Sequence, residues 1–146
     1  MIPRKGVCMK KLFFLLIAIC FFVLTGCMPN LTVQTAKIDF PGKSVNVTVK
    51  NDGNGDAGEH LTYIEINRVG APEAAKPETQ YSAKVAGIAA GSSWSSGPIP
   101  FSSFSSRGLD LYSLTAANLV VRVDAKGMVK ESNESDNLYD ANQSSP

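Results

Sequence analysis

Apolar and polar residues alternate along five short segments of the chain, which is the pattern of strands with one buried face. In the clearest case, Val45, Val47 and Val49 alternate with polar neighbours. The predicted strands are residues 30–38, 44–50, 61–69, 80–88 and 118–124. Clusters of glycine, proline, asparagine and serine separate them and predict turns. Residues 109–120 carry apolar side chains at mixed spacing, where we expect one or two helical turns. Short strands at this spacing predict an antiparallel β-sandwich or barrel.

The N-terminus has a different pattern, an unbroken apolar run of 13 residues at positions 12–24. Four bases precede the run, which is too short to cross a hydrocarbon core as a helix, since that takes about 20 residues. Together they predict a secretory signal peptide, which is left out of the fold. Met9, which two lysines follow, resembles a start site more closely than Met1 does. It is therefore open whether residues 1–8 precede the true start.

The tetrapeptide LTGC, which ends at Cys27, resembles the lipobox of bacterial lipoproteins. This resemblance implies removal of residues 1–26, attachment of lipid to Cys27 and the membrane as a partner. Two or more acyl chains anchor a protein stably. Met28 is not the aspartate that retains lipoproteins in many inner membranes, which implies the outer membrane if the source is Gram-negative. The alternative is a plain signal peptide followed by an unmodified cysteine.

Processing changes the charge of the chain. The 120 residues from Cys27 onward carry ten bases and 13 acids, a net charge of −3. A mildly acidic surface with dispersed bases argues against nucleic acid as a partner. Cys27 is then the only cysteine, so no internal disulfide can form and stability must come from core burial. This length suits one domain.

Four blocks in the mature chain carry a family resemblance: NLTV, VNVTVKNDGNGDAGE, VAGIAAGSS and VRVDAKGMVKESNESDN. They resemble CARDB, the cell-adhesion-related domain found in bacteria. The resemblance implies an all-β, immunoglobulin-like antiparallel β-sandwich of about seven strands over residues 30–141. Residues 27–29 would then be the lipidated N-terminus and a short tether, and residues 142–146 a polar tail. Only LYDA precedes this tail, so we expect a short final strand and a partly open sheet edge.

Several polar residues are candidate ligands of a calcium ion. Asp52, Asn54 and Asp56 stand at alternate positions, as at the start of an EF-hand loop. The full EF-hand pattern fails, because Ala57 replaces its glycine and Tyr63 its last glutamate. In an immunoglobulin-like sandwich, this loop and the loop before the last strand lie at the same end. The second loop carries four further candidates: Asp124, Glu131, Glu134 and Asp136.

These residues have two interpretations. Oxygen atoms from both loops could coordinate one Ca²⁺. Alternatively, each group accepts hydrogen bonds from the backbone of its own turn, as Asx-type turns do. We favour the second interpretation, expect no resident cofactor and keep Ca²⁺ as the alternative.

Other chemistry is mostly excluded. His60 is the sole histidine, so a zinc site lacks ligands, and no serine lies in a nucleophile-elbow motif. Residues 53–58 fit G-x-G-x-x-G, but a strand-like segment follows them instead of the helix that a dinucleotide site requires. We therefore expect the protein not to be an enzyme.

The serine-rich segment 92–108 carries the remaining candidates, Trp94, Phe101 and Phe104. They could form an exposed aromatic face for a glycan or a protein partner, or they could be core residues that fix a long loop. The expected function is that of a lipid-anchored cell-envelope protein with non-enzymatic adhesion or binding, its partner an envelope protein or a glycan. The alternative is a structural or assembly subunit of an envelope complex.

Overall fold

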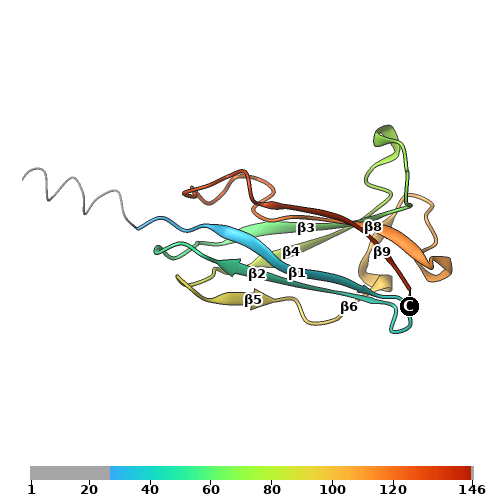
Figure 1. Cartoon of the computed structure of the whole chain (residues 1–146), viewed down its shortest axis with the longest axis horizontal. Coiled ribbons are helices and arrows are strands. Elements are labelled where there is room, and N and C mark those ends of the chain that lie inside the picture. Colours follow the sequence, from blue (N-terminus) through green and yellow to red (C-terminus); the bar gives the residue numbers. More distant parts are fainter. Residues whose placement is uncertain (1–26, 146) are drawn as a thin grey trace, which may run out of the picture.

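The computed structural model describes residues 27–145, and the signal peptide predicted for residues 1–26 lies outside them. Two antiparallel sheets pack face to face (Figure 1). The first sheet holds β1 (Leu31–Asp39), β2 (Ser44–Asn51), β5 (Ser93–Ser95) and β6 (Ile99–Pro100). The second has the order β7 (Ser105–Ser106), β4 (Thr79–Val85), β3 (His60–Asn67), β8 (Ala116–Arg122) and β9 (Leu138–Ser144). The predicted all-β sandwich is confirmed. Because β5 and β6 both pair with β2, they occupy one strand position between them.

The core lies between the sheets and follows the alternation of the sequence. Val45, Val47 and Val49 of β2 are each 0 % exposed. Leu119 and Val121 of β8 are equally buried and pair with Ile66 and Ile64 of β3. The even-numbered residues of β3 therefore face the core, which the sequence pattern left open.

A β-bulge in β1 changes which of its residues face inward. The register with β2 shifts between Val33 and Thr35, so the buried positions change from Leu31 and Val33 to Ala36 and Ile38. An extra residue in one strand reverses the alternation of the residues that follow it. This explains why residues 30–38 show no single period of two along their whole length.

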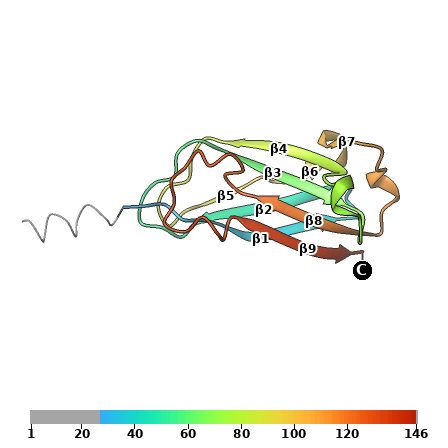
Figure 2. The same ribbon diagram turned by 90° about the horizontal axis from the view of Figure 1, so that it is seen from above.

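The end of the chain corrects one prediction. Residues 142–144 belong to β9, which pairs with β8 along its whole length, from Arg122–Leu138 to Ala116–Ser144. A polar strand can form because the ladder uses backbone groups, whatever the side chains are. β9 is the edge strand of its sheet, and Gln143 on this strand bonds to β1 of the other sheet. Its Nε2 donates to the Ala36 carbonyl at 2.9 Å and its Oε1 accepts from Ile38 N at 2.7 Å. Figure 2 shows β9 lying beside β1.

The helical turns expected in residues 109–120 are reduced to one 3-10 turn, η3 (Leu111–Ser113). β8 begins three residues later, where the segment becomes rich in valine. The other short turns are η1 (Glu73–Ala75) and η2 (Phe101–Ser103). Within residues 27–145, no helix is long and apolar enough to cross a membrane.

The sandwich has two ends, which we name by the chain that forms them. The N-terminal end consists of residues 27–30 and the loops 52–59, 86–92 and 123–137. The opposite end consists of residues 40–43, 68–78 and 99–115. Figure 1 shows the start of the described chain at one end and the end of β9 at the other.

Candidate functional site

Asn51, at the end of β2, organises the N-terminal end of the sandwich. Its side chain is 0 % exposed, and its Oδ1 accepts from Asn30 N at 3.0 Å and from Gly53 N at 3.1 Å. Its Nδ2 donates to the carbonyls of Gly55 at 2.8 Å and Ile88 at 2.9 Å. All four hydrogen-bonding positions of the amide are used. Sequence reasoning missed Asn51, although an asparagine that ends an apolar strand before a glycine-rich loop was a possible signal.

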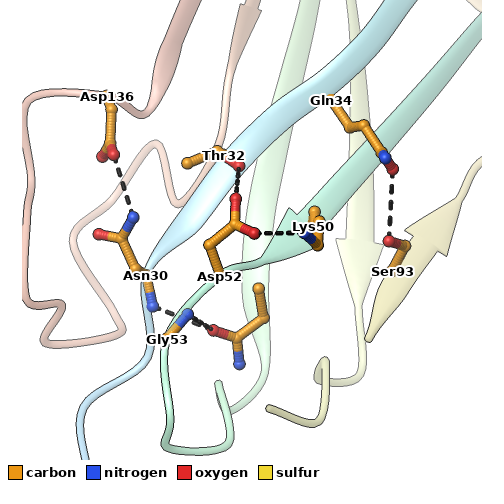
Figure 3. Close-up of polar contacts among 9 residues, drawn as sticks. Asn30, Thr32, Gln34, Lys50, Asp52, Gly53, Ser93 and Asp136 are labelled. Carbon is orange, nitrogen blue, oxygen red and sulfur yellow. Dashed lines mark hydrogen bonds and ion pairs between the residues drawn. The ribbon is translucent and has the colours of Figure 1, made fainter. Parts of the chain in front are cut away.

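Residues 28–30 lie between two loops of this end. Met28 N donates to Asn54 Oδ1 at 3.1 Å, and the Met28 carbonyl accepts from Asn54 N and Gly55 N. The carbonyl of the buried Pro29 accepts from Ser132 N at 2.9 Å. Asn30 Nδ2 donates to Asp136 Oδ2 at 3.0 Å, as Figure 3 shows. The predicted tether of residues 27–29 is therefore packed against the domain from Met28 onward.

The three calcium candidates of the first loop accept hydrogen bonds from the protein. Asp52 pairs with Lys50 and accepts from the Thr32 hydroxyl at 2.9 Å (Figure 3). The hydrogen bond from Lys50 lowers the pKa of this exposed carboxyl. Asn54 accepts from Met28, and Asp56 Oδ1 accepts from Ala90 N at 2.9 Å.

The second loop uses its acids in the same way. The buried Asp124 accepts from Met128 N and Val129 N, both at 2.8 Å, and its φ of 43° is one that aspartate tolerates better than most residues. Glu134 Oε1 accepts from Glu131 N at 2.9 Å. Asp136 accepts from Asn30 through Oδ2, while its buried Oδ1 has no protein partner.

Glu131 is as buried as Asp124, with 5 % of its surface exposed. Its Oε2 accepts a short hydrogen bond from Leu31 N, and its Oε1 accepts from Asn137 Nδ2 at 2.9 Å. Burial raises the pKa of the Glu131 carboxyl, and the hydrogen bond from Leu31 opposes this rise. Glu131 therefore fastens the start of β1 to a loop 100 residues further along the chain.

The structure brings the two loops to the same end, as expected, with residues 28–30 bonded to both of them. Among residues 27–145, no group of three or more histidine, cysteine, aspartate or glutamate side chains is placed to hold a metal ion. Each of the seven candidates accepts a hydrogen bond from the protein. Only Asp124 and Glu134 accept from the backbone of their own turn, as the interpretation that we favoured requires, and the other five accept from side chains or from backbone elsewhere in the chain. Calcium binding stays a prediction for a solution measurement.

His60 lies inside the sandwich at the start of β3. It is 0 % exposed, its Nδ1 lies 2.9 Å from the Gly58 carbonyl, and its Nε2 has no protein partner. It is buried although it begins a strand, because the inward face of β3 starts at this residue. A histidine without solvent access cannot reach a substrate.

The aromatic candidates do not form the exposed face considered from the sequence. Phe101 is 3 % and Phe104 is 8 % exposed, and both belong to the core. Trp94, in β5, is partly buried against that core. The serine-rich segment passes from the first sheet, at β5 and β6, to the second sheet, at β7. Its large side chains point into the core between the sheets, and most of its serines are exposed. Phe101 and Phe104 are therefore corrected from binding-face residues to core residues that fix the segment.

Both residues nevertheless contribute to the lining of a cavity of about 240 Å³ at the opposite end. Tyr112, 54 % exposed, stands at its rim, with its ring centroid 5.9 Å from that of Phe101 in an edge-to-face arrangement. Asp110 caps η3, since its Oδ1 accepts from Tyr112 N at 3.0 Å, and Lys43 Nζ donates to the Tyr112 carbonyl at 3.1 Å. The remaining lining residues are Ser102, Ser106, Leu109 and Leu111. Sequence reasoning missed this cavity. It treated residues 109–120, which include Tyr112, only as a candidate for helical turns.

Cys27, the predicted lipid-attachment residue, is exposed and free at the N-terminal end. Its thiol is open to modification, and lipid attachment itself stays a prediction.

Two packed antiparallel sheets with these connections define an immunoglobulin-like β-sandwich domain. The CARDB family model matches residues 28–141, and the chain belongs to this family. The match indicates an adhesion-related domain and no catalytic family.

Two solved structures resemble the fold. One is the solution structure of a domain of a candidate cell surface protein from Methanosarcina acetivorans. It is 18 % identical, with a TM-score of 0.55, and covers 82 % of this chain and 93 % of that one. The other is the CARDB domain of a Pyrococcus furiosus protein in complex with di-metal ions. It is 17 % identical, with a TM-score of 0.49, and covers 82 % of this chain and 90 % of that one. Among curated proteins, none matches this chain.

Proposed function

We propose that this protein is a lipid-anchored domain of the bacterial cell envelope, without enzymatic activity, that binds a partner at the end opposite its anchor. The observation that carries the proposal is the placement of two features. Cys27, inside a lipobox-like sequence, lies at one end of the sandwich, and the cavity beside Tyr112 lies at the other. A relative named as a candidate cell surface protein supports the envelope location.

The lining of the cavity favours a glycan. The exposed ring of Tyr112 offers flat apolar surface beside the buried Phe101 and Phe104, while Ser102 and Asp110 offer hydroxyl and carboxylate oxygens. A sugar ring has apolar faces and a rim of hydroxyl groups, so this combination of surfaces is complementary to it. A few polar groups in a mostly apolar pocket are typical of small-ligand sites. A protein partner that inserts one side chain is the other possibility.

Binding of the mature chain to an envelope glycan array tests the proposal. Tyr112→Ala should reduce binding at least tenfold, because the exposed ring is the part of the cavity that a ligand reaches first. Val69→Ala is the matched control, since Val69 is 52 % exposed at the same end but does not line the cavity. Equal binding by the two variants would refute a role for the cavity.

The alternative function is that of an assembly subunit of an envelope complex. It rests partly on strand addition at the last strand, and β9 pairs with β8 on one side and is the edge strand of its sheet. Crosslinking in cells followed by purification separates the two functions. Stoichiometric recovery with one complex would favour the subunit.

A further inference from the structure

The domain begins directly at the predicted lipid-attachment residue, with no free linker between them. Met28 exchanges hydrogen bonds with Asn54 and Gly55, and the next residue, Pro29, is buried and bonded to Ser132. A lipid on Cys27 would therefore be joined to a residue whose neighbour is already part of the sandwich.

Two glycines make this close packing possible. A Cβ atom at Gly53 or at Gly55 would lie less than 3.0 Å from backbone atoms of Met28 or Cys27. By contrast, a Cβ atom at Gly58, in the same loop, would meet nothing within 4 Å. Because Gly53 and Gly55 have no side chain, the backbone of residues 27–30 can pack directly against them.

The same end exposes a tip that suits the interface of a bilayer. Met128 is 52 % exposed, and the exposed Lys126 and Lys130 stand on either side of it. Asp124 holds this tip through its bonds to Met128 N and Val129 N, so Met128 has a fixed position. Apolar side chains beside lysines are typical of segments that lie at the surface of a membrane.

Two exposed acids of this end pair with lysines, Asp52 with Lys50 and Glu59 with Lys84. Two others, Asp56 and Glu134, accept backbone hydrogen bonds and keep their negative charge. The sequence also limits where the bilayer can be. The apolar run of residues 12–24 ends three residues before Cys27, so an uncleaved run and an acylated Cys27 would both place lipid beside this end.

We propose that the N-terminal end of the sandwich docks on the lipid bilayer, with Met128 in the interfacial layer and Lys126 and Lys130 at the level of the lipid phosphates. This inference rests on the lipid anchor of the proposed function and adds a fixed orientation to it. The nine-residue β1 spans about 30 Å. The cavity beside Tyr112 is therefore held at about that distance from the membrane and faces away from it.

Depth-dependent fluorescence quenching tests the orientation. The acylated chain is placed in vesicles of phosphatidylethanolamine and phosphatidylglycerol (3:1) that carry a nitroxide near the lipid headgroup. A fluorophore is attached at Met128→Cys or, as the matched control, at Val69→Cys. Both positions are 52 % exposed, and they lie at opposite ends. Acylation occupies the Cys27 thiol, so the introduced cysteine is the only one that reacts.

We expect quenching at position 128 to exceed quenching at position 69 at least threefold. A ten-residue glycine-serine insertion between Cys27 and Met28 should bring the two values together, as should Gly55→Ala, whereas Gly58→Ala should leave the difference intact. Equal quenching at the two positions of the acylated chain, or a difference that the insertion leaves unchanged, would overturn the proposed docking. Mass spectrometry of the N-terminal peptide is done first. A missing acyl mass would refute the lipid anchor, whereas an acylated chain with equal quenching would refute the orientation alone.

Discussion

Replacement of Glu131 tests how the N-terminal end is held together. Its carboxylate accepts hydrogen bonds from Leu31 N and Asn137 Nδ2, and it is 5 % exposed. Glu131→Ala would leave Leu31 N without a partner in a buried position and Asn137 Nδ2 without one in a partly buried position. An unpaired buried donor costs about 1–3 kcal/mol, and the partly buried donor costs less because water can reach it, so we expect a loss of roughly 2–4 kcal/mol in the free energy of unfolding. That is a large share of the roughly 5–15 kcal/mol typical of a domain.

Glu131→Gln should behave differently at pH 7. The glutamine oxygen can still accept from Leu31 N. The Asn137 amide can turn over, because its Oδ1 has no partner in the native structure and would then accept from the new amide. The raised pKa also means that burial disfavours the ionised carboxyl, so a neutral replacement removes that cost. We expect Glu131→Gln to lie within about 1 kcal/mol of the unmutated chain.

The pH dependence supplies a second test. Because the pKa of Glu131 in the native state is raised above 4.5, its ordinary value, the native state holds more protons than the unfolded state between those two values. The contribution of Glu131 to stability is therefore complete below pH 4.5 and is lost as the pH rises through the raised pKa. Glutamine does not titrate. The stability of the unmutated chain relative to Glu131→Gln should decline from pH 4 to pH 7.

Urea unfolding of the mature chain measures both effects, with the fluorescence of Trp94, the single tryptophan, as the signal. Equal losses in Glu131→Ala and Glu131→Gln at pH 7 would show that the negative charge holds the loop. Parallel pH curves for Glu131→Gln and the unmutated chain would refute the raised pKa.

Three further measurements test other contacts. Gln143→Ala should lower the free energy of unfolding by about 1–2 kcal/mol, because two backbone groups of β1 lose their hydrogen-bond partner. Asn142→Ala, at an exposed position, should change it little, and equal losses in the two variants would refute a stabilising contact between Gln143 and β1. Glu78→Gln should cost about 1–2 kcal/mol at pH 7, because Glu78 accepts from Arg68 N and Nε at 2.6 and 2.7 Å. Arg68 lowers the pKa of Glu78, so this loss should be present above pH 4.5 and disappear as the pH falls through the lowered pKa, and a constant loss would contradict it. Replacing EDTA with Ca²⁺ should leave the thermal midpoint unchanged, and a rise would restore the calcium interpretation.

The fold was predictable wherever one strand face is apolar. The alternating valines of β2 and β8 are enough to place both strands and their buried faces. The pattern fails where backbone pairing outweighs side-chain polarity, as in residues 142–144 of β9. It also fails where a bulge reverses the alternation, as at Gln34. In both cases the deciding contact is the pairing with a neighbouring strand, which the side-chain pattern of one segment does not contain.

Residue type, by contrast, was a poor guide to the aromatic candidates. Phe101 and Phe104 lie among serines, a setting that suits an exposed face as well as a loop across a core. Which of these forms depends on whether the neighbouring sheet leaves room for the rings. β6 ends beside Ser44, the first residue of β2, and the chain then passes to the second sheet at β7. Tyr112 becomes exposed because η3 turns the chain away again before β8 begins.

The acids of the N-terminal end show why sequence alone could not separate a metal site from a set of turn caps. Both need oxygen acceptors at short spacing in two loops that meet, and both were present. The difference lies in the donors, and several of these come from far away. Asn30 donates to Asp136 across 106 residues, and Leu31 N donates to Glu131 across 100. The N-terminal segment thus supplies donors to carboxylates that a cation would otherwise have to neutralise. Residues 28–31 are thereby fixed to the domain, and a fixed connection between the proposed anchor at Cys27 and the domain is what the proposed docking requires.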